Sequence, residues 1–172
     1  MDLRAYVRDV PDFPSPGILY RDITPLLLDA RALGAAIAGL SALVAPADVD
    51  LVVAAEARGF ILGAALARDL GAGFVPARKP GKLPADTVSA RYTLEYGIDA
   101  LELHADALAD GARVLVHDDL LATGGTAGAL CELVAGLGGE IVGCAFIVEL
   151  SGLGGRDRLA PHQVHSLIAY PG

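Results

Sequence analysis

Two adjacent carboxylates, Asp118 and Asp119, stand between a hydrophobic run and a loop of small residues. The run 114–116 is typical of a strand buried on both faces of a parallel sheet, and we expect that strand to end where the carboxylates begin. Residues 120–126 form the predicted loop, and residues 127–137 are predicted to form a helix. Such a strand–loop–helix unit offers unpaired backbone N–H groups and the positive end of a helix dipole, which together bind anions such as phosphate.

The order of acids and glycines separates this loop from other phosphate-binding loops. No GxxxxGK[ST] string occurs in the chain, and a dinucleotide fingerprint would place its acid about twenty residues after the glycines. Here the acids come shortly before the glycines. A phosphate cradle beside two carboxylates, which accept hydrogen bonds from vicinal hydroxyls, suits a sugar phosphate. The alternative is that Asp118 and Asp119 are solvated residues at a strand end.

The elements that must position this unit alternate between strand and helix along the chain. The predicted strands are 50–55, 73–77, 140–148 and 164–168, and the predicted helices are 30–43 and 60–70. This alternation predicts an α/β fold with an open, mostly parallel sheet and helices on both faces. Residues 2–10 are predicted to form a short amphipathic helix. Residues 88–103 alternate between polar and apolar side chains and are predicted to be a hairpin that turns near Gly97.

Composition predicts a single domain that comprises residues 1–172. Of the 172 residues, 53% are hydrophobic and 20% are charged, which argues against disorder and supplies one continuous core. The longest uncharged run, residues 32–47, is interrupted by glycine and proline, so we expect no membrane span. The charged N-terminus is unlike a signal peptide. Cys131 and Cys144 lack metal-site spacing, and we expect buried thiols in a cytoplasmic protein.

The net charge of −8 argues against a nucleic-acid partner, because no basic face could easily dominate that field. The same charge is unexpected for a protein that binds phosphate. The conflict eases because the basic residues are concentrated in the middle third of the chain, where they can form a locally positive site. These residues are Arg58, Arg78, Lys79, Lys82 and Arg91.

The string VLVHDDLLATGGT, residues 114–126, closely resembles the phosphoribosyl-pyrophosphate motif of type I phosphoribosyltransferases. Its LLATGGT ending, and the segment FPSPGILYRDITPLL at residues 13–27, resemble the adenine phosphoribosyltransferase family. The resemblance implies a small hood, built from the N- and C-terminal segments, above the sheet. It also implies transfer of the 5-phosphoribosyl group from phosphoribosyl pyrophosphate to adenine, giving AMP and pyrophosphate in purine salvage. Mg²⁺ bound with the pyrophosphate, without an assigned protein ligand, and a homodimer are expected as well.

The same resemblance implies roles for individual residues. The residues for ribose and the 5′-phosphate would be Asp118, Asp119, Ala122, Thr123, Gly124, Gly125 and Thr126. Those for pyrophosphate would be Glu56, Ala57, Arg58, Arg78, Lys79 and Lys82, with a cis peptide bond between Glu56 and Ala57. Adenine would stack on Tyr20, where most members carry Phe, and pair with the main chain of Leu19 and Arg21. Glu95 would be the catalytic residue, and Tyr96 would share its flexible loop.

Other interpretations remain open at several of these positions. Tyr20 could be a half-buried aromatic at a strand edge, Arg58 a surface charge, and residues 78–82 a solvated basic loop. His117, where the family usually has an aliphatic residue, is expected to be a neutral histidine packed in the sheet. The competing functions are a non-catalytic regulator that senses a sugar phosphate and a transferase for xanthine or orotate. The first usually carries a nucleic-acid domain or basic face, and the segment 13–27 disfavours the second.

Overall fold

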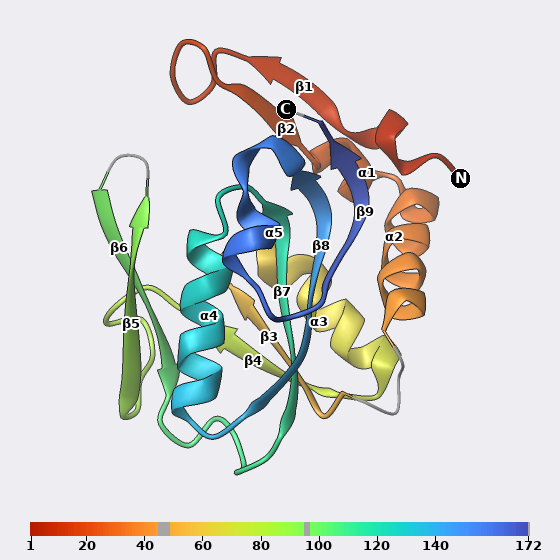
Figure 1. Cartoon of the computed structure of the whole chain (residues 1–172). Helices are drawn as coiled ribbons and strands as arrows, with labels where there is room; N and C mark the ends of the chain where they lie inside the picture. The colour runs from red at the N-terminus through yellow and green to blue at the C-terminus, as the bar shows by residue number, and fades with distance from the viewer. Residues whose placement is uncertain (45–48, 95–96, 172) are drawn as a thin grey trace.

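The computed structural model describes residues 1–44, 49–94 and 97–171 (Figure 1). The strands are β1 (Arg8–Pro11), β2 (Leu19–Asp22), β3 (Leu51–Ala55), β4 (Gly73–Ala77), β5 (Thr87–Leu94), β6 (Gly97–His104), β7 (Arg113–Leu121), β8 (Glu140–Leu150) and β9 (Val164–Tyr170). The helices are α1 (Thr24–Leu28), α2 (Ala30–Leu43), α3 (Arg58–Leu70), α4 (Gly125–Gly136) and α5 (Gly155–Arg158), with short 3-10 turns η1 (Leu3–Tyr6) and η3 (Ser151–Leu153).

A five-stranded sheet in the order β4-β3-β7-β8-β9 forms the centre of the molecule. All of its neighbouring strands pair in parallel, which confirms the open parallel sheet predicted from the alternation of strands and helices. β7 lies in the middle, so the carboxylates that follow its hydrophobic run are placed at the carboxyl edge of the sheet. Ligands of open α/β folds bind at that edge.

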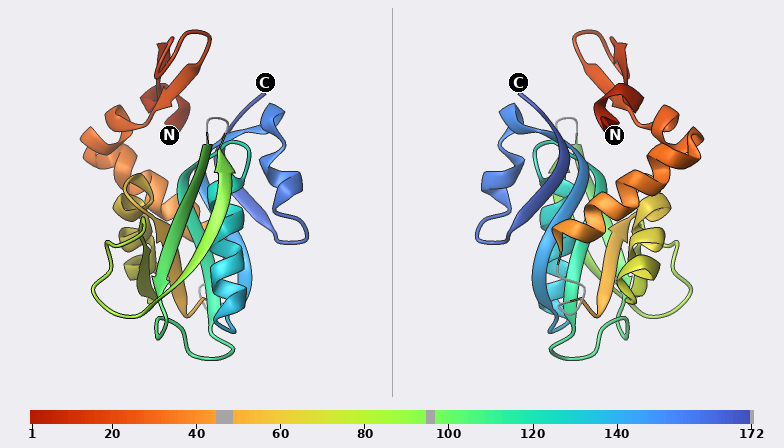
Figure 2. Two further views of the ribbon diagram at one scale, coloured as in Figure 1. Left: turned by 90° about the vertical axis from the view of Figure 1, so that its left-hand side faces the viewer. Right: turned by 90° about the vertical axis from the view of Figure 1, so that its right-hand side faces the viewer.

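Side chains alternate between the two faces of the sheet, and each face has its own core. Val53, Val116 and Phe146 pack with α4 and with the hairpin of β5 and β6. Val52 and Leu115 pack on the opposite face with α2 and α3. In the edge-on views of Figure 2 these two helices lie on one side of the sheet and α4 on the other. The predicted layers are therefore confirmed.

The N-terminal segment corrects one prediction. Residues 2–10 do not form one helix, because η1 is only a short 3-10 turn and the chain then becomes β1, which pairs antiparallel with β2. Pairing with a distant strand has overridden the local helical pattern. The β1–β2 hairpin and the end of β9 together form the expected hood (Figure 1). There the guanidinium carbons of Arg4 and Arg21 lie 4.7 and 3.9 Å from the ring centre of Tyr170.

Two further predictions concern buried sulfur and membrane spans. Cys131 and Cys144 are both buried and in the thiol form, with 3.8 Å between their sulfur atoms, which confirms buried thiols. Among the residues that the structure describes, no helix has the length and apolar character needed to cross a membrane.

Candidate active site

The motif loop, residues 122–126, follows β7 and includes the first two residues of α4. A cavity of about 180 Å³ opens here, lined by Arg58 and residues 118–127. β7 continues to Leu121, two residues beyond the carboxylates, so the prediction that the strand ends at Asp118 is wrong. The strand is longer because its pairing with β8 extends to Leu121, opposite Glu149. The carboxylates consequently sit on a rigid strand rather than in the loop.

Glycine is required at two places where this loop approaches other backbone. Gly124 has a left-handed backbone, with φ of 79°, at the position before α4. A Cβ on Gly155, at the start of α5, would lie 2.3 Å from the Ala122 carbonyl oxygen. The motif loop is therefore packed against α5, and the first turn of α4 presents its N–H groups to the cavity.

The paired carboxylates have unusual electrostatics. Asp118 accepts a 2.9 Å hydrogen bond from the backbone N–H of Asp119. Burial, together with the neighbouring Asp119 charge, raises the pKa of Asp118 well above its ordinary value. Burial also raises the pKa of Asp119, while the charge of Arg58 opposes that shift. Two adjacent acids in a poorly solvated cavity stay ionised most readily when cations or hydroxyl donors face them.

One carboxylate oxygen of Asp119, Oδ2, accepts no hydrogen bond from the described residues. Oδ2 lies 3.2 Å from Arg58 Nε, close enough for an ion pair but without the alignment of a hydrogen bond. Within the described ranges this buried atom has no hydrogen-bond partner. A buried acceptor left unsatisfied is costly, so the site is suited to a ligand that donates a hydroxyl hydrogen.

The turn between β3 and α3 places Arg58 over the carboxylates. The peptide bond between Glu56 and Ala57 is cis, which confirms the predicted position. α3 begins at Arg58, and a Cβ on Gly59 would lie 2.8 Å from Asp118 Oδ1. Only a residue without a side chain lets the first turn of α3 pack this closely on Asp118.

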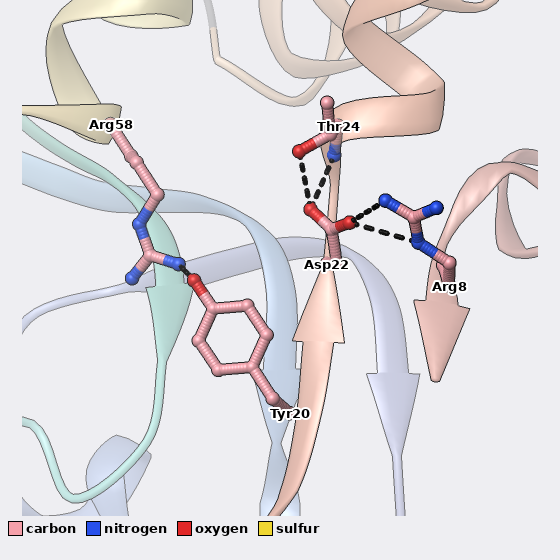
Figure 3. Close-up of polar contacts among 5 residues, drawn as sticks. All are labelled: Arg8, Tyr20, Asp22, Thr24 and Arg58. Atoms are coloured by element: carbon pink, nitrogen blue, oxygen red, sulfur yellow. Dashed lines mark hydrogen bonds and ion pairs between the residues drawn. The ribbon is translucent and has the colours of Figure 1, made fainter. Parts of the chain in front are cut away.

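Arg58 also contacts the segment predicted to bind the base. Its Nη1 donates to the hydroxyl of Tyr20 on β2, as Figure 3 shows. Phe13 packs edge-on against the Tyr20 ring, with 5.1 Å between ring centres. Of the neighbouring residues, Leu19 is largely exposed, and the side chain of Arg21 pairs with Asp9. Thus Tyr20, Arg58 and Asp119, which come from three distant segments, meet at one place.

Asp22 fixes the strand that carries Tyr20. It accepts hydrogen bonds from the backbone and hydroxyl of Thr24, at 2.9 and 2.5 Å, and pairs with Arg8 at 2.6 Å (Figure 3). Chiefly because of the Thr24 hydroxyl, the pKa of Asp22 is lowered to about 2. Asp22 is therefore ionised at neutral pH and ties β1, β2 and the start of α1 together.

The basic loop, residues 78–82, is joined to the cis turn by Glu56. Glu56 Oε1 accepts from the backbone N–H of Lys79 at 2.7 Å and from Arg78 Nε at 3.2 Å. The backbone N–H of Lys82 donates to the Lys79 carbonyl at 3.3 Å, closing a turn. The predicted pyrophosphate residues of the two segments therefore form one connected surface beside Arg58.

Three residues named in the sequence analysis, Glu95, Tyr96 and His117, have not yet been placed. Glu95 and Tyr96 lie outside the described residues. His117 is fully buried and its Nδ1 lies 2.9 Å from the Ala145 carbonyl oxygen. Burial lowers its pKa to about 4, so the interpretation of a neutral histidine packed in the sheet is confirmed.

Sequence reasoning missed several residues that shape the site. Gly59 and Gly155 have no role in the sequence analysis, and Tyr92 and Asp99 are there only alternating positions of a hairpin. Three of the four show no local pattern that could have identified them, because their contacts lie in other segments of the chain. A glycine adjacent to a charged turn, as in the pair 58–59, is the one signal that could have suggested close packing.

Comparison with known proteins agrees with this geometry. The family model described as "Phosphoribosyl transferase domain" matches residues 23–165. An adenine phosphoribosyltransferase of Thermotoga neapolitana is 58% identical over 170 residues, covering 99% of this chain and 100% of its own length.

Solved structures agree as well. The adenine phosphoribosyltransferase of Thermoanaerobacter pseudethanolicus has a TM-score of 0.95 at 50% identity, with 98% of each chain covered. That of Saccharomyces cerevisiae, solved with adenine and an imino-altritol bisphosphate, has a TM-score of 0.92 at 38% identity, with 96% of each chain covered. The chain therefore belongs to the adenine phosphoribosyltransferase family.

Proposed function

We propose that this enzyme transfers the 5-phosphoribosyl group of phosphoribosyl pyrophosphate to adenine, releasing AMP and pyrophosphate in purine salvage. The observation that carries the proposal is the meeting of Tyr20, Arg58 and Asp119 at the cavity beside the motif loop. Base, leaving group and ribose must be adjacent for this reaction, and the three segments assigned to them are adjacent. The relatives at high identity, including the yeast enzyme solved with adenine, support the choice of base.

The mechanism depends on position and charge. As pyrophosphate leaves, the anomeric carbon gains positive character, so groups that favour a cationic sugar and an anionic leaving group accelerate the step. Asp118 and Asp119 would accept from the ribose hydroxyls and stabilise the cationic ring. The motif loop, residues 122–126, would hold the 5′-phosphate through backbone N–H groups and the Thr123 and Thr126 hydroxyls.

The leaving group and the base complete the assignment. Arg58, Arg78, Lys79 and Lys82 would bind the pyrophosphate, with Glu56 and Ala57 forming the turn beside it. Tyr20 would stack on adenine, and the main chain of Leu19 and Arg21 would form hydrogen bonds with the Watson–Crick edge of the base. Glu95 would act as the acid–base group for the proton on the imidazole ring of adenine, as the bond to the anomeric carbon forms. Tyr96 would share the loop that closes over both substrates.

Mg²⁺ is the expected cofactor, and the donor set fits it. Hard carboxylate oxygens suit Mg²⁺, which prefers few protein ligands together with phosphate oxygens and water. In the described part of the chain, no three His, Cys, Asp or Glu side chains gather into a metal cage. Mg²⁺ would be held mainly by the pyrophosphate and water, and Asp118 and Asp119 are the carboxylates that line the cavity. When bound, it would neutralise charge on the leaving group.

We also propose a cytoplasmic homodimer. Free thiols 3.8 Å apart are typical of a reducing compartment. Leu28 and Ile61 are large apolar side chains exposed at 81% and 49%, and burial of either by a second copy would be favourable. Sedimentation equilibrium would measure the mass in solution, and a monomer at micromolar concentration would contradict the dimer.

Product formation from labelled phosphoribosyl pyrophosphate, measured with a panel of bases, tests the function. Adenine should exceed hypoxanthine and guanine by about 10⁴-fold in kcat/KM, because the wrong base leaves buried donors and acceptors unpaired. Comparable turnover of guanine, xanthine or orotate would contradict the choice of adenine. Tight binding of phosphoribosyl pyrophosphate without turnover of any base would indicate the sensor instead.

A further inference from the structure

The β5–β6 hairpin is hydrogen-bonded to the basic loop, residues 78–82. The backbone N–H of Arg78 donates to the Glu102 carbonyl at 3.0 Å, and the Glu102 N–H donates back to the Arg78 carbonyl at 2.7 Å. The Gly81 N–H donates to Glu102 Oε2 at 3.1 Å. β6 and the basic loop are thus joined through Glu102, and none of these three hydrogen bonds involves the Lys79 side chain.

Asp99 of β6 adds a charged contact to this unit. Its Oδ2 lies 2.8 Å from Lys79 Nζ, the ammonium assigned to pyrophosphate. The hydrogen bond raises the pKa of Lys79 and lowers that of Asp99, so both groups are charged at neutral pH. The Lys79 side chain is 54% exposed, and an exposed pair of this kind contributes little to stability. The contact between Asp99 and Lys79 is therefore better explained by its effect on the position of the Lys79 ammonium.

Tyr92 connects the same position to the opposite end of the site. It lies directly across from Asp99 in the β5–β6 pairing and is buried against α4. Its hydroxyl interacts with the side chains of both Asp99 and Thr126. Thr126 belongs to the motif loop, so the stem of the hairpin spans from the residue that faces pyrophosphate to the residue that faces the 5′-phosphate.

We propose that Asp99 is a positioning residue that couples Lys79 to the stem of the β5–β6 hairpin, so that the ammonium assigned to pyrophosphate is held in its catalytic place. The inference rests on the proposed function. The structure contains the coupling as the contacts of Asp99 and Glu102 with the basic loop.

Coupling of this kind predicts opposite effects on binding and turnover. Asp99→Asn removes a negative charge beside the pyrophosphate, so electrostatics favours binding, and KM for phosphoribosyl pyrophosphate should hold or fall. Turnover should decrease, because the Lys79 ammonium is no longer held in place by Asp99. A purely structural role would instead raise KM and lower kcat together.

The experiment is steady-state kinetics on the full-length chain. Asp99→Asn should lower kcat about tenfold with no rise in KM, a scale set by the sensitivity of rates to small misplacements. In a Lys79→Met background, Asp99→Asn should cause no further loss, since contacting residues that act together are not additive. Asp106→Asn is the matched control, an exposed acid in the turn after β6, and should keep kcat within about twofold.

Hydrogen exchange separates this inference from the assignment of substrate. Phosphoribosyl pyrophosphate with Mg²⁺ should protect the backbone amides of both the basic loop and β6 in the wild type. In Asp99→Asn, which keeps the Glu102 contacts, the protection of β6 should be weaker while that of the basic loop holds. An unchanged kcat, a parallel rise in KM, additive losses with Lys79→Met, or equal protection of β6 in both proteins would overturn the coupling. Failure of the wild type to use adenine would overturn the proposed function, while the exchange result would still decide the coupling.

Discussion

Arg58 is the residue that links the segments of the site. It approaches Asp119 with Nε and donates from Nη1 to Tyr20, so a single guanidinium faces both the sugar carboxylates and the base segment. The planar fork of arginine allows this, whereas a lysine ammonium could serve only one of the two directions. Its alternative interpretation as an uninvolved surface charge is therefore wrong, although the ligand that it binds stays a prediction.

We expect Arg58→Ala to weaken binding of phosphoribosyl pyrophosphate far more than binding of AMP. Loss of hydrogen bonds to a charged group corresponds to about tenfold or more in affinity. AMP has no pyrophosphate and should lose much less. Isothermal titration of both ligands measures the difference, and Arg68→Ala at the exposed far end of α3 serves as the control. Equal losses for the two ligands would assign Arg58 to the 5′-phosphate or to the fold.

The elements that were predicted well are those whose stability is decided locally. Asp29 caps α2 by accepting from two backbone N–H groups, and the predicted range 30–43 is the observed one. The range 73–77 is likewise the observed β4. The segment 2–10 was mispredicted because its strand exists only by pairing with β2, and the end of β7 was misplaced because β8 extends it. In both cases a distant partner decided the boundary.

The packing of α5 on the motif loop gives a prediction at the scale of elements. Gly155→Ala would place a methyl group against the Ala122 carbonyl and Leu121, and backbone cannot rotate away as a side chain can. We expect a loss of about 1–3 kcal/mol in unfolding free energy, together with weaker binding of phosphoribosyl pyrophosphate.

Denaturant titration and isothermal titration check the two effects on Gly155→Ala. Gly34→Ala is the control, because nothing lies within 4 Å of a Cβ at this helical position, and it should be neutral or slightly stabilising. Lost stability with unchanged affinity would mean that α5 moves and the motif loop does not.

At the scale of the whole molecule, the net charge of −8 is reconciled with an anion site by local pairing. Asp99 and Glu56 contact Lys79 and Arg78, so part of the acidic excess lies beside the cations themselves. The sequence located the basic residues, but it could not show which acids face them, because those contacts join positions about twenty residues apart or more. Motifs therefore identified the ligand-facing residues, while the residues that position them required the fold.

His117 should make global stability depend on pH. Its pKa is lowered to about 4 by burial, and an unfolded histidine titrates near 6.5. Between these values the unfolded chain binds a proton that the folded chain refuses, so stability falls as the pH decreases from 6.5 to 4. The slope approaches at most about 1.4 kcal/mol per pH unit.

Asp118 and Asp119 act in the opposite direction, because their raised pKa values favour the folded state as the pH falls toward their unfolded value. The total pH profile therefore mixes both contributions, and a variant is needed to separate them. His117→Leu removes only the histidine titration; the lost hydrogen bond to Ala145 shifts its stability by an amount independent of pH. Urea unfolding at about pH 4.5, 5.5, 6.5 and 7.5 gives the unfolding free energy as a function of pH. The curves for wild type and variant should converge as the pH falls. Parallel curves would mean that His117 takes up its proton within the folded sheet.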